Sequence, residues 1–194
     1  MKLLACPKCH QQLHLENKTL KCENNHCYDI SKRGYINLLL NPDKATNNPG
    51  DSKESLVARK AYLNKGYYDP ILNQVVTCID EFKHQDDLSI LDLGCGEGYY
   101  TQGLKKHFEN SDIYGLDISK IAIDMATRYR KDVTWLVGNS KNIPILDHSL
   151  DFICALFTVV NQDELKRALK EDGYIIHVTA NNQHLIEIKE LIYD

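Results

Sequence analysis

The chain has 194 residues, of which 43% are hydrophobic and 26% charged, and its formal net charge is −4. These proportions are typical of globular proteins and exclude a disordered, collagen-like or coiled-coil chain. No apolar run approaches the roughly 20 residues that a membrane-spanning helix needs, and the N-terminal residues lack the apolar region of a secretory signal. We therefore expect a cytoplasmic protein with no membrane partner.

The charges are distributed unevenly along the chain. Residues 1–65 contain eleven Lys and Arg against six Asp and Glu, whereas residues 66–194 contain twelve against twenty-one. A basic segment on an acidic body is expected where one part of a protein contacts a polyanion such as RNA, although chance or a solvated surface is the alternative. The candidates for phosphate contacts are Lys32, Arg33, Arg59, Lys60 and Lys65.

Four of the seven cysteines lie in the first 27 residues. Cys6 and Cys9 form a CxxC pair, Cys22 follows at a distance, and His26 and Cys27 follow Cys22 after three and four intervening residues. Two thiolates separated by two residues can bind one ion, and a second pair completes the tetrahedron of a structural Zn²⁺ site. The spacing leaves the fourth ligand open between His26 and Cys27. A redox CxxC is the alternative, but it would not require the second cluster.

A linker and two helices follow. Residues 41–55 are rich in Pro, Gly and small polar residues, which indicates a linker or surface loop. Asp51 or Ser52 can cap a helix that ends near Asn64, and a second helix over 69–84 begins with a Pro in its first turn.

From residue 89 the pattern changes to short apolar runs that alternate with helical stretches, which is typical of a doubly wound parallel sheet covered on both faces. The predicted strands are 89–94, 113–117, 133–138, 150–157 and 173–180. The predicted helices are 98–109, 119–130, 161–171 and 182–192.

A glycine loop joins the first of these strands to a helix. It reads Asp92-Leu-Gly94-Cys-Gly96-Glu97-Gly98, a GxGxG pattern that lets the backbone approach a ligand closely. A lone glycine motif is weak evidence, because NAD-binding sheets use a similar one. The GxGxG spacing and the preceding Asp92 point instead toward S-adenosylmethionine.

Polar residues at the next two strand ends sharpen this interpretation. Asp117, followed by Ile118, ends the second strand, where a carboxylate can accept hydrogen bonds from ribose hydroxyls. Asn139 and Ser140 follow the third strand in a turn that resembles the adenine-reading G-D-A-x-x-L-P turn of class I methyltransferases, with Asn139 in place of the Asp. Together with the glycine loop, these positions favour a class I methyltransferase over an NAD enzyme.

A series of motifs resembles the bacterial 23S ribosomal RNA guanine-N1 methyltransferases over most of the chain. The zinc cluster is followed in order by KRGYINLL (32–39), PGDS (49–52), AR (58–59), G-x-Y-x-P (66–70) and DLGCGEGYYT (92–101). The resemblance implies a methyltransferase that modifies N1 of a guanine in a 23S rRNA hairpin and uses its zinc module to help bind the RNA.

The resemblance also implies roles for individual residues. The zinc ligands of the family match Cys6, Cys9, Cys22 and His26, and the methyl-donor contacts match Tyr68, Gly96, Glu97 and His184. The fourth strand ends in Leu156–Asn161 without the Asn/Asp-Pro-Pro-aromatic turn of exocyclic-amine methyltransferases, which mildly favours a ring nitrogen as acceptor. Tyr35, Tyr67, Tyr68 and Tyr99 are candidates for stacking on the acceptor base.

The predicted organisation has three parts. Residues 1–40 form a zinc-binding RNA-recognition module, 41–85 a linker with helices, and 86–194 the S-adenosylmethionine-binding domain. Because members of the family continue for several tens of residues, we expect a Rossmann-like, mostly parallel sheet that is incomplete at its C-terminal side and a truncated domain.

Two other functions remain open at this stage. A small-molecule methyltransferase could use the zinc module as a lid, and a remnant of the fold could bind the donor or RNA without catalysis. The sequence leaves open a homodimer and assigns no general base.

Overall fold

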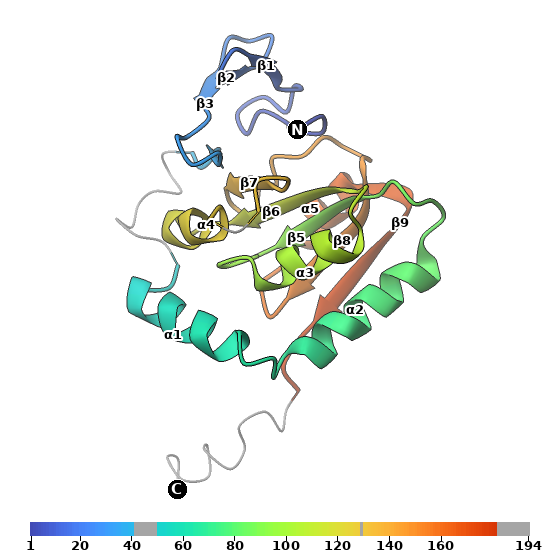
Figure 1. The fold of residues 1–194 in the computed structure, drawn as a ribbon. Coiled ribbons are helices and arrows are strands. Elements are labelled where there is room, and N and C mark those ends of the chain that lie inside the picture. The colour runs from blue at the N-terminus through green and yellow to red at the C-terminus, as the bar shows by residue number, and fades with distance from the viewer. Residues whose placement is uncertain (41–49, 129, 182–194) are drawn as a thin grey trace, which may run out of the picture.

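The computed structural model describes residues 1–40, 50–128 and 130–181. Its strands are β1 (His14–Glu16), β2 (Thr19–Lys21), β3 (Cys27–Asp29), β4 (Ile36–Asn37), β5 (Ser89–Leu93), β6 (Asp112–Asp117), β7 (Thr134–Val137), β8 (Leu150–Leu156) and β9 (Leu169–Val178). They form a small antiparallel sheet of order β1-β2-β3 and a six-stranded sheet of order β4-β7-β6-β5-β8-β9, in which all neighbours are parallel. Figure 1 shows the small sheet above the large one.

The predicted α/β class with a parallel sheet is confirmed, and all five predicted strands are present. The sixth strand, β4, comes from the segment 1–40 that we assigned to the zinc module, and it pairs with β7 through Ile36 and Leu136. A strand of two residues carries no alternating pattern, so its sequence gives no sign of this pairing.

The helices are α1 (Lys53–Leu63), α2 (Asp69–Phe82), α3 (Tyr99–His107), α4 (Lys120–Ala126) and α5 (Gln162–Ala168). The predicted N-cap of α1 is confirmed, since the Ser52 hydroxyl accepts the backbone N–H of Ser55 at 3.1 Å. The helix predicted over 161–171 ends at Ala168, and β9 begins directly after it. The helix predicted over 182–192 lies outside the described residues. Within the described part of the chain, no helix is long and apolar enough to cross a membrane.

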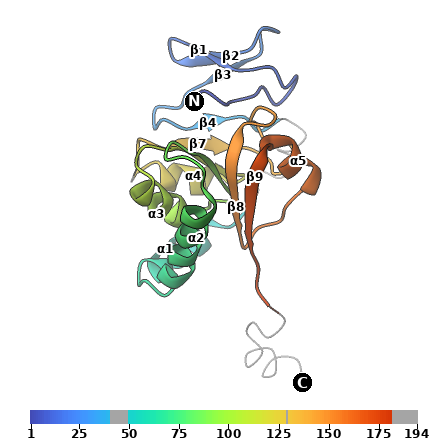
Figure 2. The same cartoon turned by 90° about the vertical axis from the view of Figure 1, so that its right-hand side faces the viewer.

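The large sheet is covered on both faces by different kinds of structure. Ile90 packs on one face with buried residues of α2, α3 and α4, whereas its neighbour Leu91 packs on the other with Leu165 of α5. Figure 2 shows α2 and α3 on one side of β8 and β9 and α5 on the other.

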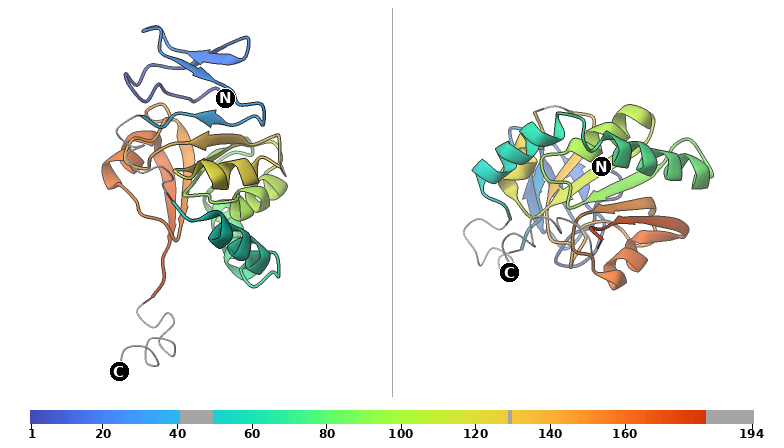
Figure 3. Two further views of the ribbon diagram at one scale, coloured as in Figure 1. Left: turned by 90° about the vertical axis from the view of Figure 1, so that its left-hand side faces the viewer. Right: turned by 90° about the horizontal axis from the view of Figure 1, so that it is seen from below.

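The N-terminal module completes the cover of the second face. Leu4 and Cys22 belong to the same buried cluster as Leu91 and Leu136 of the sheet. The backbone also joins the two parts, because Ala5 N–H donates to the Pro144 carbonyl at 3.0 Å and Leu146 N–H to the Leu3 carbonyl at 2.9 Å. The left view in Figure 3 shows the module directly above the β4 edge. The module and the sheet therefore share one core.

Candidate metal centre and ligand cavities

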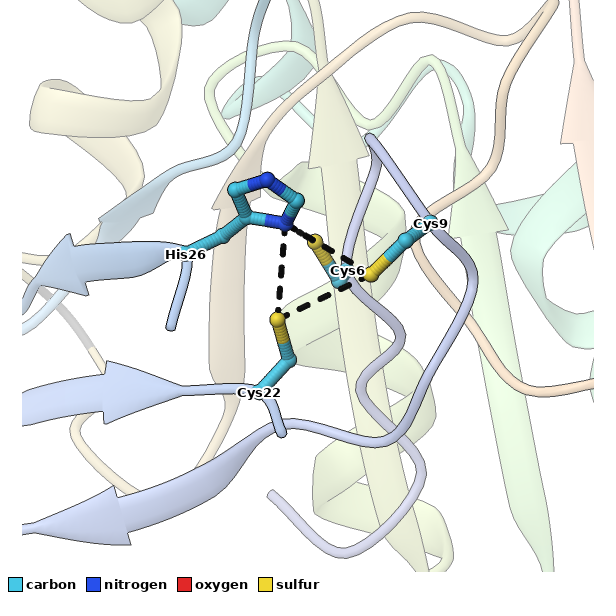
Figure 4. A group of neighbouring side chains, drawn as sticks. All are labelled: Cys6, Cys9, Cys22 and His26. Carbon is cyan, nitrogen blue, oxygen red and sulfur yellow. Dashed lines mark hydrogen bonds between the residues drawn. The ribbon is translucent and has the colours of Figure 1, made fainter. Parts of the chain in front are cut away.

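Cys6, Cys9, Cys22 and His26 converge on one point of the N-terminal module (Figure 4). The Cys9 and Cys22 sulfurs are 3.6 Å apart, and His26 Nδ1 lies 3.4 Å from Cys6 Sγ and 3.5 Å from each of the other two sulfurs. A tetrahedral Zn²⁺ ion with Zn–S of about 2.3 Å and Zn–N of about 2.0 Å separates its ligands by roughly 3.5–3.8 Å. The four side chains fit a structural Zn²⁺ site, with no position left for water.

Cys27 lies outside this cluster. It starts β3, its side chain is exposed, and its thiol lies 3.4 Å from the Asn25 carbonyl oxygen, to which it donates. The Tyr28 hydroxyl instead reaches Cys6, at 3.3 Å from the sulfur. Burial raises the pKa of Tyr28, so the hydroxyl keeps its proton and can donate to a thiolate.

The glycine loop turns sharply after β5. Gly94, Gly96 and Gly98 have φ values of 73°, 56° and 87°, which favour glycine. The backbone also approaches other segments closely, because a Cβ at Gly94 would lie 2.4 Å from the Thr158 hydroxyl oxygen. The Gly94 N–H donates to the Leu116 carbonyl at 2.8 Å, which fixes the loop beside the end of β6.

Asp117, the last residue of β6, is held beneath the loop. One carboxylate oxygen accepts the Gly96 N–H at 2.9 Å and the other accepts the Ser119 N–H at 2.7 Å. Burial raises the pKa of the Asp117 carboxyl, although these two N–H groups favour its charged form. Each oxygen keeps a second lone pair, which can accept a hydrogen bond from a ligand hydroxyl such as that of a ribose.

Two cavities meet at the loop, and Gly94 lines both. The smaller cavity, of about 220 Å³, brings together four predicted donor-site residues: Asp117, Ile118, Asn139 and Ser140. The larger cavity, of about 320 Å³, brings together three others: Tyr68, Gly96 and Glu97. The strand ends therefore form one continuous site at the carboxyl edge of the sheet, as in other open α/β folds.

Two buried polar atoms of residues that line the larger cavity have no hydrogen-bond partner among the described residues. They are Glu97 Oε1 and the Tyr100 hydroxyl oxygen. Glu97 is only 3% exposed, and burial raises its pKa while the nearby cations Arg59 and Lys60 oppose that shift. Because buried polar groups are nearly always satisfied, these atoms fit a bound polar ligand. A carboxylate in this place suits the ammonium group at the amino-acid end of S-adenosylmethionine.

Not every predicted donor-site residue lines these cavities. Asp92 is 1% exposed and accepts a hydrogen bond from the Thr101 hydroxyl beneath the loop. Gly98 is the N-cap of α3, and a Cβ there would lie 2.6 Å from the Trp135 ring. Asp92 and Gly98 therefore stabilise the conformation of the loop and do not line the cavities. His184 lies outside the described residues.

The basic residues predicted to contact RNA are spread over the surface. Arg59 lines the larger cavity and forms an ion pair with Asp51, whereas Lys60 follows it on α1. Lys65 is exposed just beyond the end of that helix.

The remaining two candidates follow the zinc module. Lys32 is exposed, and Arg33 forms an ion pair of 2.9 Å with Asp124 of α4. The structure therefore brings the five candidates into two groups.

Our sequence analysis missed Phe157 as a wall of the larger cavity. This residue directly follows β8 and is 46% exposed. The available signal was its position, since residues just after parallel strands face the ligand in such sheets. Of the tyrosines predicted to stack on a base, Tyr68 and Tyr99 line the cavity, whereas Tyr35 is 8% exposed in the core.

The fold, the glycine loop and the metal cluster define a class I S-adenosylmethionine-dependent methyltransferase with an N-terminal zinc ribbon. Residues 90–173 match a methyltransferase-domain family model, and residues 4–45 match a zinc-ribbon model described as RlmA, N-terminal. Among solved structures, a methyltransferase from Methanococcus maripaludis has a TM-score of 0.56 at 22% identity over 76% of this chain and 74% of its own. The plantazolicin methyltransferase BpumL has a TM-score of 0.57 at 21% identity over 73% of this chain and 58% of its own. These two likenesses concern the fold.

Similarity over nearly the whole chain identifies the family. YxjB of Bacillus subtilis, named as a "Putative 23S rRNA (guanine-N(1)-)-methyltransferase", is 30% identical over 98% of this chain and 69% of its own length. The 23S rRNA (guanine(748)-N(1))-methyltransferase of Streptomyces fradiae is 28% identical over 99% of this chain and 68% of its own length. The chain belongs to the family of 23S rRNA guanine-N1 methyltransferases.

Proposed function

We propose that the protein transfers a methyl group from S-adenosylmethionine to N1 of a guanine in a hairpin of 23S rRNA, in the cytoplasm. The observation that carries this proposal is the match to named guanine-N1 methyltransferases across both the zinc ribbon and the methyltransferase domain. A methyltransferase domain alone would leave the substrate class open.

We assign the donor to the two adjoining cavities. Asp117 would accept the ribose hydroxyls, and Asn139 and Ser140 would contact the adenine in the smaller cavity. Gly94 would lie where the two cavities meet, and Glu97 would accept hydrogen bonds from the ammonium group at the amino-acid end. Asp92 would keep the loop in shape without touching the donor.

The bound donor supplies an electrophilic methyl group on its sulfonium. Guanine N1 carries a proton in the neutral base, so the site must hold the base in line with the methyl while that proton is released. The base must also leave its stack before N1 becomes accessible. We place the unstacked base against the wall of the larger cavity, beside the glycine loop.

Primer extension on 23S rRNA tests the proposal. A methyl on N1 blocks Watson–Crick pairing, so reverse transcriptase should stop one nucleotide before the modified guanine after incubation with the donor. Mass spectrometry of the nucleosides should find 1-methylguanosine. The RNA must come from a strain that lacks the modification. Donor consumption with no methyl in RNA would favour a small-molecule methyltransferase, and donor binding without turnover would favour a remnant.

A further inference from the structure

Phe157 has an unusual backbone conformation. Five non-glycine residues in the described part of the chain have positive φ, and the other four are Asn or His, which tolerate this region better. Phe157 has φ of 55°. A bulky residue in this region is strained, and such strain persists only where the surroundings determine the conformation.

Two neighbours determine the conformation of this turn. The Phe157 N–H donates to the Val178 carbonyl of β9 at 2.8 Å, which ties the turn to the adjacent strand. The next residue, Thr158, lies directly against Gly94, where even a Cβ atom would clash. The position of the ring is therefore set by the sheet on one side and by the glycine loop on the other.

The ring is placed on the wall of the larger cavity. Phe157 and Tyr68 meet at 76° with their centroids 6.0 Å apart, so the two rings form a corner. Glycine residues of the loop line the same cavity. A planar base that stacked on Phe157 would lie roughly perpendicular to the Tyr68 ring and beside the glycine loop.

We propose that Phe157 is the stacking platform for the acceptor guanine. This inference rests on the proposed function and names a subsite of the same cavity, one that takes a planar purine. Phe157 remains 46% exposed, so it gains only part of the burial energy of a core phenylalanine, and stability alone is a weak reason for this residue at a strained position. Stacking of a base on an aromatic ring supplies a reason for the ring.

Two substitutions at position 157 distinguish the contribution of the ring from that of the strained backbone. Phe157→Gly removes the ring and relieves the positive φ, so the fold should be retained, whereas Phe157→Trp keeps a stacking surface. We expect Phe157→Gly to lower kcat/KM for rRNA by about 5- to 150-fold, the loss that corresponds to one stacked base. Phe157→Trp should retain most of the activity. Phe82→Ala is the matched control, because Phe82 is 44% exposed at the end of α2, away from this cavity.

A binding cycle tests the contact without catalysis. One RNA is the unmodified hairpin that contains the target guanine. A second version carries an abasic nucleotide in place of that guanine. The wild-type protein should bind the intact hairpin about 5- to 150-fold more tightly, and Phe157→Gly should bind both alike.

Equal discrimination by wild type and Phe157→Gly would overturn the proposal. So would a loss of affinity for S-adenosylhomocysteine as large as the loss of kcat/KM, because Phe157 would then serve the donor. Failure of the proposed function is a different result, namely no methylation of 23S rRNA by the wild-type protein.

Discussion

The side-chain amide of Asn142 donates a hydrogen bond of 2.8 Å to the carbonyl oxygen of Pro7. Pro7 lies between the metal-cluster residues Cys6 and Cys9, and Asn142 lies in the turn that begins at Asn139 on the wall of the smaller cavity. The bond therefore links the metal centre to the wall of the smaller cavity, where we propose that the adenine of the donor binds. Since the module and the sheet also share one core, metal binding and donor binding should be coupled.

Removing one zinc ligand tests this coupling. Cys9→Ser should abolish the bound zinc, lower the melting temperature by about 10 °C and weaken the binding of S-adenosylhomocysteine, because the Pro7 carbonyl loses its fixed position. Zinc content by mass spectrometry, a thermal scan and calorimetry measure the three effects. Cys27→Ser is the control, since this exposed thiol lies outside the cluster and the variant should keep its zinc. Full donor affinity in zinc-free protein would contradict the coupling.

Replacing the carboxylate at the end of β6 should affect donor binding most. Asp117→Ala removes the anchor of the Gly96 and Ser119 N–H groups and the acceptor that we propose for the ribose hydroxyls, so the affinity for S-adenosylhomocysteine should fall by about 100-fold. Asp112→Ala removes a carboxylate from the other end of the same strand and should leave the affinity unchanged. Titration calorimetry compares the two variants, and similar dissociation constants would remove Asp117 from the site.

Local sequence patterns predicted the residues of the metal and ligand sites better than they predicted how the N-terminal module packs on the sheet. The zinc residues and the glycine loop depend on spacing within short segments, and their side chains converge as expected. The packing of the module on the sheet depends on contacts such as Leu4 with Ile145, which are more than a hundred residues apart. Nothing in either segment alone identifies its partner. Phe157 did carry a local signal, its position just after β8, but the conformation of its turn depends on Val178 and on the contact of Thr158 with Gly94.

The buried carboxyl of Asp92 should make stability depend on pH. Burial, with repulsion from Asp117 and Glu97, raises its pKa to about 7, and the hydrogen bond from Thr101 only partly offsets this. An unfolded Asp titrates near pH 4, so between about pH 4 and pH 7 the folded state holds a proton that the unfolded state has lost. This contribution to stability is full below pH 4, falls as the pH rises through 7, and is lost above it.

Asp92→Asn tests this prediction. The amide cannot ionise, so the variant should be more stable than wild type at pH 8 by a few kcal/mol, and the difference should shrink toward pH 5. Urea unfolding at several pH values measures the free energy of unfolding. Asp87→Asn, at an exposed position, controls for the loss of a carboxylate. A difference that does not change with pH would show that Asp92 is ionised in the folded protein across this range.

Binding of RNA by the basic residues should depend on salt in a residue-specific way. If Lys32 contacts a phosphate, Lys32→Ala should weaken binding of the 23S hairpin several-fold and reduce the slope of log K against log salt by about 0.7–0.9, because one fewer counterion is released. Lys106→Ala removes an exposed Lys from α3 and should leave the slope unchanged. Fluorescence anisotropy from 50 to 300 mM salt measures both slopes. Parallel lines for wild type and Lys32→Ala would remove this residue from the RNA interface.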